Sequence, residues 1–171
     1  MRFRSILISI LFAFVCFTFA SSQNWNDYRP QGCRCMVSVL KTPDYSVKDV
    51  ASDVGTLKMH QFMMDYGEHA FLLTYTDYPA TLTDSKTPER ILEDVVSGSV
   101  SDGELVRKIE LTIDGHPGKE YTARKTDFTL KGRVFLVNQR LYQLISVYPP
   151  NKADELSSDV EEFLRSFRLL H

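Results

Sequence analysis

Four short apolar segments in the second half of the chain constrain the fold most. They span residues 105–113, 119–125, 133–137 and 141–147, and each has the length and composition of a β-strand. Asp114-Gly115 and Pro117-Gly118 are expected to turn the chain after the first segment, and Asn138-Gln139 separates the last two. Successive strands with such short connections predict an antiparallel meander.

The first half of the chain adds three more expected strands. From residue 33 the side chains alternate, with Cys33, Cys35, Val37 and Val39 on one face and Arg34, Met36, Ser38 and Leu40 on the other. Residues 56–64 and 69–76 are also strand-like, and the turn glycine Gly67 lies between them. This pair is expected to form a hairpin.

Two segments have the signals of helices. Thr87-Pro88-Glu89 provides an N-cap, a proline at the first helical position and an acidic first turn, and the apolar spacing continues to Gly98. Residues 153–167 carry an apolar stripe at steps of three and four. The sequence therefore predicts an α+β layered sandwich: a mostly antiparallel sheet of about six to seven strands with helices packed on its faces.

The N-terminus is typical of a secretory signal peptide. Arg2 and Arg4 precede an uncharged apolar run, residues 6–20, which is shorter than the roughly 20 residues that cross a bilayer as a helix. We expect cleavage after Ala20, and an exported protein of the periplasm or external medium. The predicted organisation is a signal peptide at 1–20, an arm at 21–32 and one domain at 33–171. The sequence leaves open an uncleaved anchor, or lipidation at Cys16.

Charge and motif content narrow the function. Loss of residues 1–20 leaves 18 basic and 22 acidic residues, so we expect no nucleic-acid partner and no stable membrane insertion after cleavage. The sequence has no lipase-type serine motif, zinc-protease motif, dinucleotide fingerprint or calcium loop. We therefore expect a non-enzymatic protein with no cofactor.

Four phrases of the sequence resemble the Mog1/PsbP-like fold family, which includes exported bacterial members of unknown function. The phrases are FLLTYTDYP (71–79), ERILEDVV (89–96), IDGHPGKEY (113–121) and GRVFLVNQRLYQL (132–144). The resemblance covers roughly residues 33 to 169. His116 and Lys119 stand where the commoner pattern has an aromatic residue and an arginine. Because members include a photosystem II extrinsic subunit and a Ran-binding protein, the resemblance implies binding or assembly work and transfers no catalytic residue.

Cys33 and Cys35 form a C-x-C pair in the first expected strand. In an extended strand their Cα atoms would be about 6.5 to 7 Å apart, near the upper limit for a disulfide, so a local bridge needs a kink. An oxidising compartment favours the bridge over free thiols. Capture of a soft metal ion by two thiolates is a third interpretation.

The segment 58–64, with Met59, His60, Met63, Met64 and later His69, contains side chains that bind copper. Strand alternation places neighbouring donors on opposite faces, so we expect core methionines and surface histidines, and no metal site.

A basic hairpin and one turn are the candidate binding surface. Between residues 124 and 140, five basic residues accompany a single acid, Asp127. The candidate binding residues are His116, Lys119, Arg124, Arg133 and Arg140, with His116 in the expected turn 115–118. They would suit an acidic protein partner or a small anionic ligand, although a solvated sheet face explains the same pattern.

Two functional hypotheses follow. The first is an exported, non-enzymatic accessory or binding protein whose partner or ligand the sequence does not name. The second is a small redox or metal-binding protein that uses the Cys33/Cys35 pair.

Overall fold

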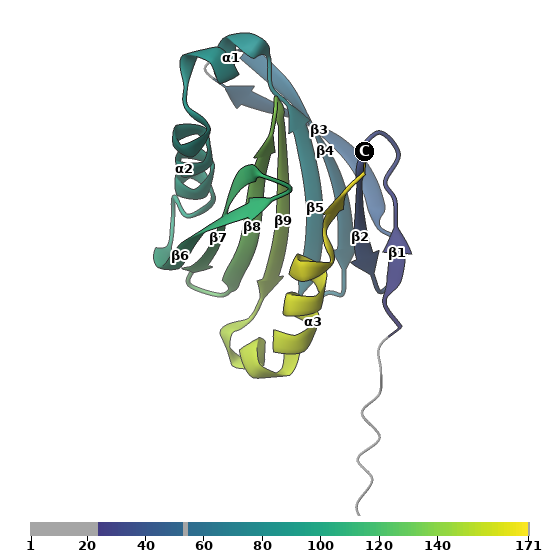
Figure 1. The fold of residues 1–171 in the computed structure, drawn as a ribbon. Helices are drawn as coiled ribbons and strands as arrows, with labels where there is room; N and C mark the ends of the chain where they lie inside the picture. The colour runs from purple at the N-terminus through teal and green to yellow at the C-terminus, as the bar shows by residue number, and fades with distance from the viewer. Residues whose placement is uncertain (1–23, 53–54, 171) are drawn as a thin grey trace, which may run out of the picture.

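A seven-stranded antiparallel sheet is the central layer of the fold (Figure 1). The computed structural model describes residues 24–52 and 55–170, and the expected signal peptide lies outside them. In spatial order the strands are β3 (Asp44–Ser52), β4 (Gly55–Asp65), β5 (Ala70–Asp77), β9 (Arg140–Tyr148), β8 (Thr129–Val137), β7 (His116–Arg124) and β6 (Glu104–Ile113). The predicted meander of the last four strands and the β4–β5 hairpin are present.

One face of the sheet is covered by helix α2 (Pro88–Ser99). Thr87 caps it, because its side chain accepts a hydrogen bond from the backbone N–H of Arg90 at 3.3 Å. The apolar stripe of α2 packs with buried side chains of β7 and β8, including Tyr121 and Val134. This end of the sheet therefore has a small hydrophobic core of its own.

The opposite face carries the larger core. Val134 and Phe135 are consecutive residues of β8 whose side chains point to opposite faces, and Phe135 belongs to the core beneath α3 (Ala153–Ser166). A three-stranded sheet of β1 (Asn26–Tyr28), β2 (Cys35–Val39) and β10 (Arg168–Leu169) lies beside α3 (Figure 1). These layers confirm the α+β sandwich expected from the sequence.

The structure differs from the sequence-based prediction at several elements. Strand β3, the short helix α1 (Ala80–Ser85) and the 3₁₀ turn η1 (Pro150–Lys152) were not predicted. Part of the expected arm forms β1, which pairs with β2. The predicted turn at Pro117-Gly118 is wrong: the β6–β7 turn is Asp114-Gly115, and β7 already begins at His116. Within the described residues, no helix combines the length and apolar character needed to cross a membrane.

Candidate functional site

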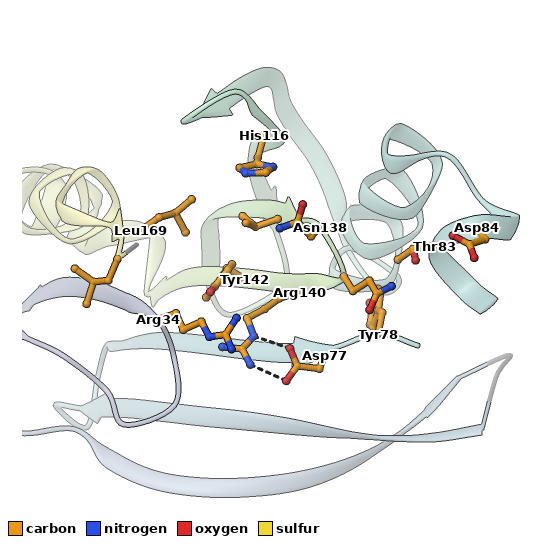
Figure 2. Close-up of a pocket in the computed structure, with 13 residues that line it drawn as sticks. Arg34, Asp77, Tyr78, Thr83, Asp84, His116, Asn138, Arg140, Tyr142 and Leu169 are labelled. Carbon is orange, nitrogen blue, oxygen red and sulfur yellow. Dashed lines mark hydrogen bonds and ion pairs between the residues drawn. The ribbon is translucent and has the colours of Figure 1, made fainter. Parts of the chain in front are cut away.

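A cavity of about 910 Å³ lies at the end of the sheet where β5 and β8 finish and β7 and β9 begin (Figure 2). Five separate parts of the chain line it: the Cys33–Cys35 loop, β5 with α1, the β6–β7 hairpin, the β8–β9 turn and the C-terminal strand. Representative lining residues from these parts are Arg34, Asp77, Thr83, His116, Asn138 and Leu169. The cavity is therefore a product of the tertiary fold and of no single motif.

A disulfide between Cys33 and Cys35 flanks Arg34, the residue through which this loop lines the cavity. The two Cα atoms are 5.1 Å apart, closer than in an extended strand, and the intervening residue Arg34 has a φ of 56°. This left-handed conformation is the kink that a local bridge requires. Both cysteines are buried, and the hydroxyl of Tyr142 donates a hydrogen bond of 2.7 Å to the carbonyl of Cys33. The disulfide and the Tyr142 hydrogen bond therefore fix the backbone of the loop, and the Arg34 side chain lines the cavity.

Arg140 and Asp77 form a two-point ion pair beside this loop. Nε of Arg140 lies 2.5 Å from Oδ1 of Asp77, and Nη2 lies 2.7 Å from Oδ2. Nη1 of Arg140 donates to the carbonyls of Gly32 and Cys33 at 2.7 and 2.9 Å. The guanidinium also lies 4.5 Å from the ring centroid of Tyr75. Arg140 is therefore a structural clamp that joins β5, β9 and the disulfide loop.

Electrostatics at the cavity are dominated by this pair. The hydrogen bonds from Arg140 lower the pKa of Asp77 below its ordinary value, and the nearby charge of Arg34 lowers it further. The same pair raises the pKa of Arg140. Arg34 is exposed, and among the described residues its guanidinium has no hydrogen-bonded or ion-paired partner. Figure 2 shows the Arg34 side chain extending toward Arg140, with the His116 ring on the opposite wall.

The predicted binding residues do not form one surface. Lys119 is buried beneath α2, where its Nζ lies 2.5 Å from Glu110 and 3.5 Å from Glu93. Arg133 lies beneath α3, paired with Glu120 at 2.8 Å and bonded to the carbonyl of Leu164 at 3.1 Å.

The remaining three predicted residues lie in other parts of the fold. Arg124 is exposed, 3.8 Å from Glu104. His116 and Arg140 line the cavity. The structure therefore brings together only these two of the five predicted binding residues.

The methionine- and histidine-rich segment is part of the packing. His60 stacks on Tyr75 with a centroid separation of 4.3 Å, and its Nδ1 lies 2.8 Å from the hydroxyl of Tyr45. Met64 is buried in the core, and His69 stacks on Tyr66. No group of three or more His, Cys, Asp or Glu side chains in residues 24–52 and 55–170 is arranged to hold a metal ion.

Arg34, Asp77 and Asn138 are cavity residues that the sequence analysis did not select. Arg34 had a usable signal, because a disulfide between residues i and i+2 forces the residue between them away from the core. Asn138 lies in the predicted β8–β9 turn and has a φ of 56°, which asparagine tolerates well. Asp77 carries no local sequence signal, because its partner Arg140 is 63 residues away.

Comparisons with known proteins identify the fold. No family model matches the sequence, and no curated protein matches it. The chain is similar in structure to cyanobacterial PsbP (CyanoP) from Synechocystis sp. PCC 6803, with a TM-score of 0.55 and 15% sequence identity, covering 88% of this chain and 95% of that chain. It is less similar to PA94 of Pseudomonas aeruginosa, a protein of unknown function (TM-score 0.43, 8% identity, 79% and 90% covered). The first similarity confirms a PsbP-like fold and, at this identity, shows the fold alone.

Proposed function

We propose that this protein is an exported, non-enzymatic accessory or binding protein, and that the cavity beside the Cys33–Cys35 disulfide is its interaction site. The observation that carries the proposal is that five separate chain segments converge on one cavity, where the guanidinium of Arg34 has no hydrogen-bonded or ion-paired partner among the described residues. Polar side chains held on a rigid scaffold are typical of ligand and partner sites.

Two observations support the export part of the proposal. The apolar run 6–20 has the pattern of a signal peptide, and a disulfide such as Cys33–Cys35 persists in oxidising compartments. Intact-mass spectrometry of the protein from its own cells tests this part. We expect a chain that begins at Ser21 and is two hydrogens lighter than its reduced form. A full-length mass would contradict cleavage.

The non-enzymatic part rests on the chemistry of the cavity. Among the described residues, His116 has no hydrogen-bonded acid or nucleophile, so nothing there is arranged to activate a base. The alternative redox function gains little support, because thiol exchange needs an accessible sulfur and Cys33 and Cys35 are only 0% and 1% exposed. The disulfide is better explained as the brace that presents Arg34.

A pair of matched substitutions on α1 tests the interaction site. Thr83 lines the cavity, whereas Thr81, two residues away, is exposed and does not line it. We expect the tryptophan of Thr83→Trp to fill the cavity and abolish recovery of the ligand or partner that copurifies with wild-type protein from its own cells. Thr81→Trp should leave that recovery unchanged. Equal recovery with both variants would place the interaction elsewhere.

A further inference from the structure

We propose that the group bound in this cavity is an oxyanion, a carboxylate or a phosphate, and that Arg34 is the residue that recognises it. This inference rests on the proposed function, because it names the chemistry of the ligand for the same cavity. The inference starts from a charge imbalance: the guanidinium groups of Arg34 and Arg140 both lie near one carboxylate, that of Asp77.

Asp77 is the shared carboxylate. Arg140 contacts both of its oxygens, and the charge of Arg34 also contributes to the lowered pKa of Asp77. Two positive charges therefore surround one negative charge. The other acid of the lining, Asp84, lies on α1 at the far end of the cavity from Arg34 (Figure 2). Among the described residues, the end of the cavity near Arg34 thus carries one uncompensated positive charge, which an anionic ligand would neutralise.

The hydrogen bonds that the two guanidinium groups already make indicate that Arg34, and not Arg140, is available to bind the anion. Nε and Nη2 of Arg140 are bonded to Asp77, and Nη1 is bonded to two backbone carbonyls. Arg140 could bind a ligand only by giving up part of this clamp. In the described structure the guanidinium of Arg34 makes none of these bonds, so its planar set of N–H donors is available to two oxygens of one carboxylate or phosphate.

The backbone around Arg34 is already fixed before any ligand binds. The disulfide joins the residues on either side, and the carbonyl of Arg34 accepts a hydrogen bond of 3.0 Å from the backbone N–H of Leu170. Only side-chain freedom of Arg34 remains to be lost on binding, which lowers the entropic cost. Asn138 and His116 line the same cavity from the β8–β9 turn and the β6–β7 hairpin, and both side chains carry N–H groups (Figure 2).

Binding of small probes to the purified protein, expressed as the full chain in its own cells, tests the proposal. The anionic probes are inorganic phosphate and N-acetyl-glutamic acid amide, and the neutral probe is N-acetyl-glutaminamide. We expect one or both anions to shift the backbone NMR signals of Arg34 and Asn138, and the neutral probe to leave them unmoved. Binding of phosphate alone or of the carboxylate alone supports the proposal and identifies the source of the oxyanion.

Arg34 variants identify the recognising residue. We expect Arg34→Gln to weaken binding by about tenfold or more, and Arg34→Lys to weaken it less, since lysine keeps the charge but not the fork. The control is Arg107→Gln, an exposed arginine of β6 outside the cavity, which should bind like wild type.

Two results would overturn the inference: wild-type affinity in Arg34→Gln, or equal binding of the neutral probe. If either occurs while Thr83→Trp still abolishes ligand or partner recovery, the oxyanion is wrong and the proposed site stands. If Thr83→Trp also has no effect, both fail.

Discussion

The basic side chains of the sheet are compensated differently under the helices and at the cavity. Under α2 and α3 each basic side chain pairs with an acid from another strand or helix. These pairs are Lys119–Glu93, Lys119–Glu110, Arg133–Glu120 and Lys131–Glu161. At the cavity, Arg140 and Arg34 lie near the single carboxylate of Asp77.

This difference separates charges that hold the fold together from a charge available to a ligand. The pairs that include a helix residue join segments distant in sequence: Lys131 and Glu161, for example, are 30 residues apart. The basic side chains of the pairs under α2 and α3, Lys119, Lys131 and Arg133, are only 5 to 19% exposed, so loss of an acid leaves a basic side chain that is costly to bury. Arg34 is exposed and carries no such cost. The comparison therefore predicts large stability effects under the helices and small ones at Arg34.

The largest effect is expected from Glu120→Ala. The Glu120 side chain is 10% exposed and its partner Arg133 is 17% exposed, so the variant leaves a largely buried arginine that keeps its hydrogen bond to Leu164 but loses its carboxylate. We expect the free energy of unfolding, measured in urea, to fall by about 3 kcal/mol. The control is Lys58→Ala, whose ion pair with Asp49 is more than half exposed, with an expected loss below about 0.5 kcal/mol. Similar losses in both variants would remove the distinction between the two kinds of pair.

Replacement of the disulfide should have an intermediate effect. A bridge between residues two apart closes a very short loop, so Cys33→Ala with Cys35→Ala should cost about 1.5 to 2 kcal/mol. Strong reductant should bring the wild type to the stability of the double variant and leave the variant unchanged. Wild-type stability that does not respond to reductant, with a stable double variant, would show that the bridge does not support the loop.

Asp77→Asn should have a smaller, pH-dependent effect. Hydrogen bonds from Arg140 lower the pKa of Asp77 in the folded protein, so the pair stabilises the fold above the unfolded-state pKa, and this contribution is lost as the pH falls through the folded-state pKa. Because the Asp77 side chain is 60% exposed, we expect a loss of about 1 kcal/mol at pH 7. The difference from wild type should shrink below about pH 4. A difference that stays constant with pH would mean that the charge of Asp77 contributes nothing.

The smallest effect on stability is expected from Arg34→Gln. The Arg34 side chain has no partner among the described residues, so the free energy of unfolding should change by less than about 0.5 kcal/mol. Thermal and urea unfolding beside wild type measure this change. A fall in the free energy of unfolding of more than about 1 kcal/mol would instead assign Arg34 a structural role, like that of the basic side chains under α2 and α3.

The fold was predictable wherever one face of an element is buried. Cys35, Val37 and Val39 are all at most 5% exposed, and their alternation indicated β2 correctly. Strand β3 was missed because all nine of its residues are exposed and its apolar alternation is short: Tyr45 and Val47 alternate with polar residues, but the pattern ends at Asp49. It forms because its backbone pairs with β4 along its full length.

Pro117 and Gly118 were mistaken for a turn because the physical reason for the glycine lies 17 residues away. A Cβ at Gly118 would lie 2.3 Å from Cδ1 of Phe135, so the glycine makes room for a core ring inside a strand. Pro117 pairs with Thr112 of β6, whereas the pairing of β7 with β8 begins only at Gly118. Proline is tolerated at this position because no hydrogen bond to β8 requires a backbone N–H there.

The candidate site was predictable only in part for the same reason. His116 and Arg140 were selected and do line the cavity, but Lys119 and Arg133 were selected without knowledge of which helices cover them. The acids that neutralise Arg133 and Lys131 come from β7 and α3, and no spacing in the sequence reveals those contacts. Arg34 could not be predicted from its own position, because a single arginine between two cysteines forms no pattern that indicates a binding residue.

The Cys33–Cys35 bridge also makes the final shape of the cavity depend on the redox conditions in which the chain folds. Without the sulfur bond, Arg34 is a non-glycine residue at a φ of 56°, and its backbone favours a return to negative φ. In a reducing cytoplasm the sheet and helices would then fold, but the backbone of the loop at residues 33–35 would not be held in its cavity-lining conformation. If the chain is exported as proposed, the bridge would form in an oxidising compartment, and the cavity would reach its final shape there and not during synthesis.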